Sequence, residues 1–350
     1  MNNKNTLLDR AIGCLLAGAA GDALGAPVEF LDRAEILRRF SAAGIRQYAP
    51  AYGGIGKITD DTQMTLFTAE GCLRAYHHSK KYGTDNSREI IRNAYLRWLH
   101  TQVTTYDRSE AEDSWLLKQS ALFSRRAPGN TCLSALSRKG GEQNNSKGCG
   151  GIMRVAPCGI LHPGDPWAAF NLGSLAAKLT HGHPSGYLAA GVFAALVAGL
   201  MAGEPLVHAA DTAREILIDC PQHEETLHAL DTARALANRG ETPEKAIPML
   251  GEGWVAEEAL AISLYCALSA SDLKAGIVMA VNITGDSDST GAITGNFLGA
   301  MHGVAAIPQH WLDPLELKDV IEMMACDLVQ LPDLDGNADK EQWLDRYPAS

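Results

Sequence analysis

GDSDSTGAITGNFLGAMHG, residues 285–303, is the stretch that decides the fold. From residue 291 onward a glycine stands at every fourth position, so the glycines share one face of a helix. They are Gly291, Gly295, Gly299 and Gly303. A glycine inside a helix costs up to about 1 kcal/mol relative to alanine, and close approach of a second backbone is the simplest compensation. The stretch therefore predicts a helix that contacts another helix backbone to backbone.

A matching stripe lies near the start of the chain, in a helix that the capping-box character of residues 6–9 (TLLD) predicts over residues 6–24. Its members are Gly13, Ala17, Gly21 and Gly25. We predict that the two striped helices cross tightly. The alternative is that each stripe packs against a different bulky neighbour. In either case the ends of both helices lie deep in the fold, and both ends carry acidic residues.

The rest of the chain is helical in pattern, with hardly any alternating apolar runs of the strand type. Helices are predicted at 62–78, 87–101, 131–137, 166–180, 185–202, 206–218, 223–238, 243–250, 255–269, 271–282, 289–304 and 314–330. The irregular segments are rich in Gly, Asn, Asp and Ser and could shape a site; they are 25–61, 102–130, 138–165 and 283–288. Hydrophobic residues make up 46% of the chain and no linker interrupts it. Residues 1–350 therefore predict one compact all-α domain of many helices.

The charge balance argues against a nucleic-acid partner. Thirty Lys and Arg stand against 41 Asp and Glu, a net charge of −11, which repels a phosphate backbone at long range. If the ligand is nevertheless an anion, bound cations or backbone N–H groups must meet its charge locally.

Cysteines and apolar stretches bear on the compartment. The eight cysteines include no CxxC pair and most lie in apolar helical patterns, which predicts reduced thiols and a cytoplasmic location. Residues 10–20 have the alternative interpretation of a short signal-peptide core, but the apolar pattern continues into Asp22. Residues 187–203 are uncharged but shorter than the roughly 20 residues of a spanning helix. We expect a buried core helix there and no membrane partner.

Two acidic motifs each precede a predicted helix, TDDT at 59–62 and GDSDSTG at 285–291. Each alone is explained by ordinary N-capping, since Asp, Ser and Thr favour that position. Together they supply four carboxylates with neighbouring hydroxyls and no His or Cys. That is a ligand set for Mg²⁺, Mn²⁺ or Ca²⁺ rather than zinc. An acid shared between the motifs could bridge two ions about 3.5–4 Å apart, as in two-metal hydrolases.

Six strings give the chain a resemblance to the ADP-ribosylglycohydrolase family, which includes the hydrolase that reactivates dinitrogenase reductase and the ADP-ribosylarginine hydrolases. They are AGAAGDALGAPVE (17–29), ITDDTQM (58–64), SKGCGGIMRVAP (146–157), LTHGHP (179–184), GWVAEEAL (253–260) and NITGDSDSTGAITGNFLGA (282–300). The strings follow the family's order and span most of the chain. The resemblance implies an all-α fold with a binuclear Mg²⁺ or Mn²⁺ centre at the bottom of a cleft for ADP-ribose.

Site residues follow from the resemblance by position. It implies two Mg²⁺ or Mn²⁺ ions with ligands Thr59, Asp60, Asp61, Asp286, Asp288 and Ser289. Family members often have Thr in place of Ser289, which leaves open whether Thr290 shares the role. Glu29 matches an acidic residue at the rim of the metal centre, where it could also contact substrate.

A glycine-rich loop and one histidine complete the implied site. The loop residues expected to wrap the ribose and diphosphate are Ser146, Gly148, Cys149, Gly150 and Gly151. Some relatives place an aromatic in this loop to stack adenine, where Cys149 stands here, so how adenine is held is open. His181 matches a histidine near the phosphates or distal ribose; on the residues alone, a satisfied core histidine is the alternative.

The predicted function is removal of ADP-ribose from a modified protein side chain, with ADP-ribosyl-arginine as preferred substrate and ADP-ribose as product. Asp61 or Glu29 would move the protons, taking one from a water or giving one to the leaving guanidine. Serine or nucleic-acid-base linkages, a non-enzymatic binding or structural relative, and a two-metal hydrolase of phosphate esters are the alternatives. The acidic run 107–113 (DRSEAED) is either a docking surface for the modified protein or a solvated loop.

Overall fold

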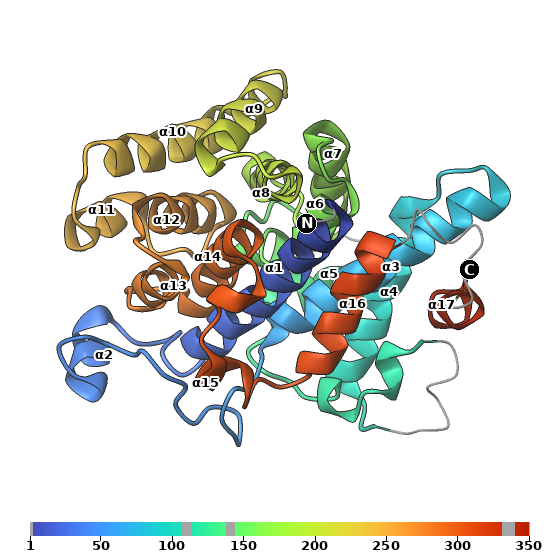
Figure 1. Ribbon diagram of the computed structural model, residues 1–350, viewed down its shortest axis with the longest axis horizontal. Helices are drawn as coiled ribbons and strands as arrows, with labels where there is room; N and C mark the ends of the chain where they lie inside the picture. The colour runs from blue at the N-terminus through green and yellow to red at the C-terminus, as the bar shows by residue number, and fades with distance from the viewer. Residues whose placement is uncertain (1–2, 107–113, 138–143, 331–339, 350) are drawn as a thin grey trace.

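The computed structural model describes residues 3–106, 114–137, 144–330 and 340–349. Within these ranges the chain is built of helices, and the β-type pairing consists of two isolated bridges, Ala51 with Gly54 and Gly148 with Val255. The prediction of an all-α fold is confirmed (Figure 1). The acidic run 107–113 lies outside the described residues.

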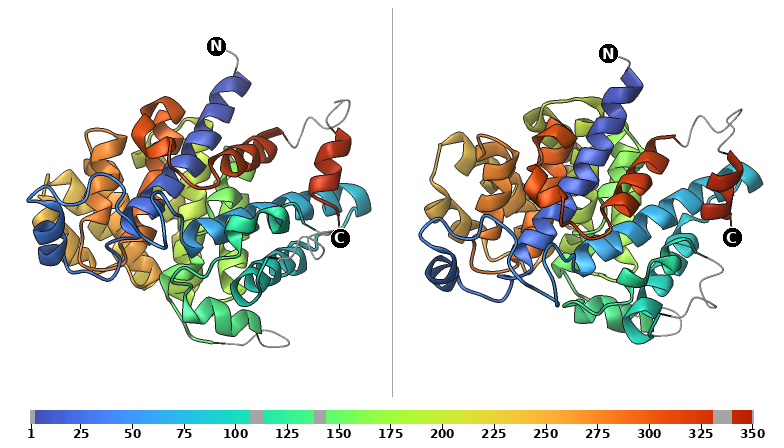
Figure 2. Two further views of the ribbon diagram at one scale, coloured as in Figure 1. Left: turned by 90° about the horizontal axis from the view of Figure 1, so that it is seen from below. Right: turned by 60° about the horizontal axis from the view of Figure 1, so that its bottom comes forward.

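The two glycine-striped helices form the centre of the molecule and run antiparallel. They are α1 (Asn3–Gly25) and α14 (Ser287–His302), which lie side by side in Figures 1 and 2. A methyl group added at Gly13 would lie 2.5 Å from the carbonyl oxygen of Gly299, and one at Gly291 would lie 2.6 Å from that of Gly21. Such distances exclude any side chain. The prediction of a tight crossing is therefore confirmed. The alternative, in which each stripe packs against a different bulky neighbour, is excluded.

Other helices surround this pair. On the α14 side lie α8 (Pro184–Ala202), α12 (Ala256–Ser269) and α13 (Leu273–Val281); beside α1 lie α3 (Asp60–Tyr82) and α16 (Lys318–Gln330). The outer helices are α4 (Ser87–Val103), α5 (Asn130–Ser137), α7 (Pro166–Lys178), α9 (Leu206–Ile218), α10 (Glu224–Asn238) and α11 (Pro243–Leu250). One hydrophobic cluster includes residues from Ala11 to Tyr347.

α8 is long and apolar enough to cross a membrane, but 89% of its apolar window is buried inside the protein. The prediction of a core helix is confirmed. Residues 10–20, which resembled a signal-peptide core, form the middle of α1 and pack along α14. All eight cysteines lie in the described ranges and are free thiols, as expected.

Among the described residues, four α-helices were missed by sequence analysis, and each is short. They are α2 (Arg33–Phe40), α6 (Ala156–Leu161), α15 (Gln309–Leu312) and α17 (Lys340–Arg346). α2 begins where the Asp32 side chain accepts a hydrogen bond from the Glu35 N–H (2.7 Å), yet it buries only Ile36, so it has little apolar periodicity. The predicted helix 314–330 begins later, at Lys318, because Leu317 has a positive φ of 56°.

Candidate metal and substrate site

The antiparallel packing of α1 on α14 brings the C-terminal end of α1 to the N-terminal end of α14. A methyl group at Gly25 would lie 2.6 Å from the Asp288 Cα atom. The start of α3 joins them, and a cavity of about 640 Å³ opens at this junction. Its acidic and hydroxyl lining consists of Glu29, Asp60, Asp61, Asp286, Asp288 and Ser289. Two motifs separated by more than 200 residues in the sequence thus share one cavity.

The closest carboxylates are those of Glu29, Asp286 and Asp288, which each offer an oxygen within 4.8 Å of the others. All three are buried. In the described part of the chain no Lys or Arg side chain forms an ion pair with any carboxylate of the cavity. Burial, followed by repulsion from Asp288, raises the pKa of Glu29, Asp60 and Asp61 well above the ordinary range.

Two carboxylate oxygens in this cavity are buried and without a hydrogen-bond partner among the described residues, Glu29 Oε2 and Asp61 Oδ1. A buried anion without a partner is strongly unfavourable. An all-oxygen donor set with unpaired buried oxygens fits a hard divalent cation, since such a cation would meet both the charge and the missing contacts. The residues present therefore fit the Mg²⁺ or Mn²⁺ site that the sequence predicts.

The N-cap interpretation is also correct, and the two roles coexist. Thr59 accepts a hydrogen bond from the Asp61 N–H (3.3 Å), and Asp286 accepts one from the Ser289 N–H (3.3 Å). Asp288 accepts from the same Ser289 N–H (3.0 Å). Capping therefore fixes the first turns of α3 and α14, while Asp60, Asp61 and Asp288 line the cavity. Thr59 is fully buried and is absent from the described cavity lining.

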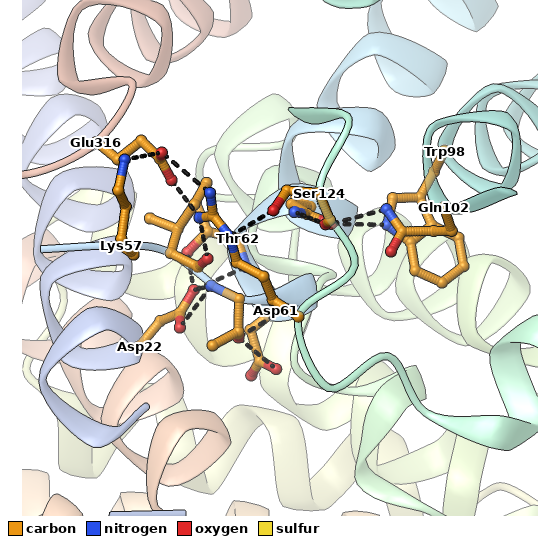
Figure 3. Close-up of polar contacts among 12 residues, drawn as sticks. Asp22, Lys57, Asp61, Thr62, Trp98, Gln102, Ser124 and Glu316 are labelled. Carbon is orange, nitrogen blue, oxygen red and sulfur yellow. Dashed lines mark hydrogen bonds and ion pairs between the residues drawn. The ribbon is translucent and has the colours of Figure 1, made fainter. Parts of the chain in front are cut away.

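Asp22 is the central residue that sequence analysis did not nominate. From the last turns of α1 its carboxylate accepts hydrogen bonds from the Thr59 N–H (3.0 Å) and from both the N–H (3.1 Å) and hydroxyl of Thr62 (Figure 3). It thereby ties the start of α3 to α1. Burial, together with the charge of Asp288, raises the pKa of Asp22 to about 7. The sequence signal that could have identified Asp22 was an acidic residue in the glycine-striped helix with no basic residue near it in the sequence.

A polar network fixes the loop that precedes α5, which contributes residues to the cavity lining. Gln63 donates to the Ser124 carbonyl (2.9 Å) and accepts from Gln102 (3.0 Å), and Arg126 donates to the Ile58 carbonyl (2.7 Å) (Figure 3). These bonds position the segment 125–130, which lines the cavity.

The glycine-rich loop is held by the turn before α12. The Cys149 N–H donates to the Trp254 carbonyl (3.1 Å), and the Ala256 N–H donates to the Lys147 carbonyl (2.8 Å). Cys149 and Gly150 reach the cavity, and the Cys149 thiol lies 2.6 Å from Asp286 Oδ2. The other residues nominated from this loop, Ser146, Gly148 and Gly151, lie outside the cavity lining.

His181 lies behind the glycine-rich loop rather than on the cavity wall. It is buried, with Nδ1 2.8 Å from the Thr180 hydroxyl, and a methyl group at Gly150 would lie 3.3 Å from its ring. Burial and the nearby Arg154 lower the pKa of His181 to about 3, so it is neutral. In this geometry the histidine supports the loop, and its contact with substrate stays a prediction.

The rim of the cavity contains side chains that sequence analysis did not identify. Phe30 and Trp254 stack with ring centroids 6.0 Å apart and an interplanar angle of 16°, and both rings are exposed. Arg125 is exposed beside them. The available signal was the position of Phe30 directly after Glu29 and of Trp254 within the string 253–260.

The family model described as ADP-ribosylglycohydrolase matches residues 3–338. The chain belongs to the ADP-ribosylglycohydrolase family. It is 26% identical over 326 residues to the ADP-ribosyl-[dinitrogen reductase] glycohydrolase of Rhodospirillum rubrum, which covers 89% of this chain and 91% of that protein. It is also 24% identical over 327 residues to the ADP-ribosylarginine hydrolase Tri1 of Pseudomonas putida. This match covers 92% of this chain and 78% of that protein.

A solved structure titled "ADP-ribosylglycohydrolase-related protein complex" has the same fold, with a TM-score of 0.65 and 26% identity over 93% of this chain and 99% of that one. The six strings quoted above all lie within the matched residues 3–338. The family resemblance is thus confirmed, and with it a hydrolase that acts on ADP-ribose linkages.

Proposed function

We propose that this ADP-ribosylglycohydrolase removes ADP-ribose from modified protein side chains, with ADP-ribosyl-arginine as the preferred linkage, and that it uses two Mg²⁺ or Mn²⁺ ions. The observation that carries the proposal is the cavity where the starts of α3 and α14 meet. Its buried carboxylates have no cationic partner among the described residues, and Cys149 and Gly150 of the glycine-rich loop also line it. The names of the two relatives, one acting on dinitrogen reductase and one on ADP-ribosylarginine, support a protein-linked substrate.

The proposed metal ligands are the residues of the two acidic motifs, Thr59, Asp60, Asp61, Asp286, Asp288 and Ser289. Divalent ions bound there would neutralise the carboxylates, orient the ribose hydroxyls and lower the pKa of a water molecule. Thr59 also caps α3, because its hydroxyl oxygen accepts from the Asp61 N–H (3.3 Å), and its hydroxyl lies 3.5 Å from Asp61 Oδ2.

Asp61 and Glu29 are the proposed proton carriers. Each has one buried oxygen that lacks a hydrogen-bond partner among the described residues, and both side chains line the cavity. Positive charge builds on the ribose as its bond to the side chain breaks, so a proton must reach the leaving guanidine and another must leave the attacking water. Such transfer contributes about 10²–10⁴-fold in rate.

The rest of ADP-ribose is proposed to follow the cavity toward its rim. The backbone N–H of Gly150 and the exposed Arg125 provide local positive charge for the diphosphate. The exposed rings of Phe30 and Trp254 provide flat apolar faces on which adenine can stack. They take the place of the loop aromatic that some relatives have where this chain has Cys149.

The test is release of ADP-ribose from an arginine-ADP-ribosylated protein, measured with Mg²⁺, with EDTA, and with Asp60→Ala and Asp288→Ala variants. We expect metal-dependent release that falls at least about 100-fold in both variants, because positioning is lost together with the metal. Asp219→Ala, an exposed acid at the end of α9, is the matched control and should keep full activity.

A serine-ADP-ribosylated protein is assayed in parallel. Release of ADP-ribose from serine but not from arginine would overturn the assignment of the arginine linkage, while the protein would still be a hydrolase. No release from either by folded, metal-loaded protein, together with a rise in melting temperature on adding ADP-ribose and Mg²⁺, would replace the enzyme by a binding protein.

A further inference from the structure

A second cavity, of about 710 Å³, lies among α2, α11 and α13 and shares no lining residue with the acidic cavity. Figure 1 shows α2 at the edge of the molecule, next to α13 and on the same side as α11. The volume falls in the range of about 300–1,000 Å³ that is usual for small-molecule sites. It is therefore large enough to hold an organic ligand.

The walls of this cavity are mainly apolar. Leu37 contributes from α2, Ile247 from α11, and Val278 and Met279 from α13, with Ile283 just beyond. α2 itself buries only Ile36. Leu37, Val278 and Met279 are only half-buried, so an apolar ligand body in the cavity would remove them from water.

Hydrogen bonds at both ends of the α2 segment fix the cavity. At the start, the Arg33 N–H donates to the Thr284 hydroxyl (3.0 Å) and the Arg33 guanidinium bonds Glu244 (3.2 Å). At the end, Asn282 accepts from the Ile45 N–H (2.7 Å) and donates to the Ile45 carbonyl (2.9 Å). These four contacts hold α2 away from α11 and α13 at a defined position.

The charged side chains that line the cavity differ in the contacts that they make. Arg33 is paired with Glu244, and Asp272 caps α13 by accepting from the Ala275 N–H (2.8 Å). Arg46 and Lys274 also line the cavity, and neither forms an ion pair with any residue that the structure describes. The remaining acid of the lining is Glu252, which is exposed. The lining thus has three basic and three acidic side chains and is neutral overall, but Arg46 and Lys274 are left without an acidic partner among the described residues, whereas Asp272 is held as the N-cap of α13.

We propose that this cavity is a binding site for a small amphipathic organic anion. Its apolar body would lie among α2, α11 and α13, and its carboxylate, sulfonate or phosphate would meet Arg46 and Lys274. The site is separate from the acidic cavity, so the proposal does not depend on the substrate of the hydrolase.

The test uses two fluorescent probes of similar shape with the full chain in Mg²⁺: anilinonaphthalene sulfonate, an anion, and N-phenyl-naphthylamine, its neutral counterpart. We expect one bound sulfonate per chain. The double variant Arg46→Gln, Lys274→Gln should weaken the anion about tenfold and leave the neutral probe unchanged, since only a charge-assisted contact is removed. Lys318→Gln, at the start of α16, is the control for charge alone and should change neither.

Two cavity-filling variants, Ala43→Trp and Ala275→Trp, should weaken both probes, with circular dichroism and melting temperature verifying the fold. Equal affinity for the sulfonate in wild type, double variant and a folded filling variant would overturn the proposal. If the double variant binds both probes more weakly by the same factor, the proposal that Arg46 and Lys274 recognise an anionic group would be overturned.

Discussion

At the scale of single residues, we expect Asp22 to be the most sensitive position, because its carboxylate accepts three hydrogen bonds from the start of α3. Asp22→Asn replaces one acceptor oxygen by an amide that opposes these donors. In the metal-loaded protein we expect the free energy of unfolding to fall by about 2–4 kcal/mol, and ADP-ribose release to require more Mg²⁺.

The measurement is thermal unfolding together with a Mg²⁺ titration of activity. Asp9→Asn is the matched control on the same helix, since Asp9 accepts one exposed hydrogen bond from the Val304 N–H (3.2 Å). An Asp22→Asn protein with the stability and Mg²⁺ requirement of Asp9→Asn would show that Asp22 does not position α3.

Trp254 allows the proposed adenine contact to be tested separately from the chemistry. Trp254→Ala should raise KM for the ADP-ribosylated substrate about tenfold with little change in kcat, because a stacking contact is worth about 1–3 kcal/mol and is present before and during bond cleavage. Trp167→Ala, which removes an exposed tryptophan of α7, is the control. A fall in kcat at unchanged KM would place Trp254 in the chemical step instead.

At the scale of elements, the α1–α14 contact predicts intolerance to even one methyl group. In Gly291→Ala the new Cβ would lie 2.6 Å from the Gly21 carbonyl oxygen, a backbone atom that cannot move aside alone. We expect a loss of about 1–3 kcal/mol or more in the free energy of unfolding. Urea unfolding measures it, with Met301→Ala, a half-exposed position on the same helix, as comparison.

A Gly291→Ala protein as stable as Met301→Ala would mean that the two backbones separate without cost. The interface would then be looser than its distances indicate, and the position of the proposed metal ligands at its end would not depend on it.

Sequence reasoning succeeded where a pattern is local and long. The glycine stripes and the apolar runs predicted α1, α14 and α8 closely, because helical periodicity repeats over several turns. It missed α6, which has six residues and too few turns to show a periodicity, and α2, which buries only Ile36 and so has no apolar stripe. It also missed Asp22, whose role depends on hydrogen bonds to residues about 40 positions away in sequence.

The acidic motifs predicted which carboxylates share a cavity, because each motif stands at a helix N-terminus. They could not reveal that His181 and Gly151 lie outside the cavity lining, since the way a loop and its neighbouring residues turn toward or away from a cavity follows from packing that no local pattern records. The metal ions and the roles of the ligands stay predictions for the assays described above.

At the scale of the whole molecule, the buried acids make stability depend on pH when no metal is bound. The folded-state pKa of Asp22 is about 7, against an ordinary 3.8, and those of Glu29, Asp60 and Asp61 are raised as well. At a pH between the ordinary pKa and the raised folded-state pKa, these carboxyls keep their protons in the folded chain but lose them in the unfolded chain. Metal-free protein should therefore lose stability as pH rises from 5.5 to 8.

Differential scanning fluorimetry in EDTA and in Mg²⁺ at both pH values measures this effect. We expect the melting temperature in EDTA to be several degrees lower at pH 8 than at pH 5.5, and Mg²⁺ to raise it more at pH 8. An Asp60→Asn, Asp288→Asn double variant should have a smaller pH dependence in EDTA. Identical responses to Mg²⁺ at both pH values would contradict the ionised-cluster explanation.

The pairing of α1 with α14 also sets an order of events during synthesis. Asn296 donates to the Cys14 carbonyl (2.8 Å) across this interface, and the two residues are 282 positions apart. At ribosomal rates of about 5–20 residues per second, α1 must wait on the order of 15–60 s for its partner to emerge. Until then its glycine-lined face is uncovered and Asp286 and Asp288 do not yet exist. The acidic cavity, and with it the proposed metal site, is therefore completed only in the last part of translation.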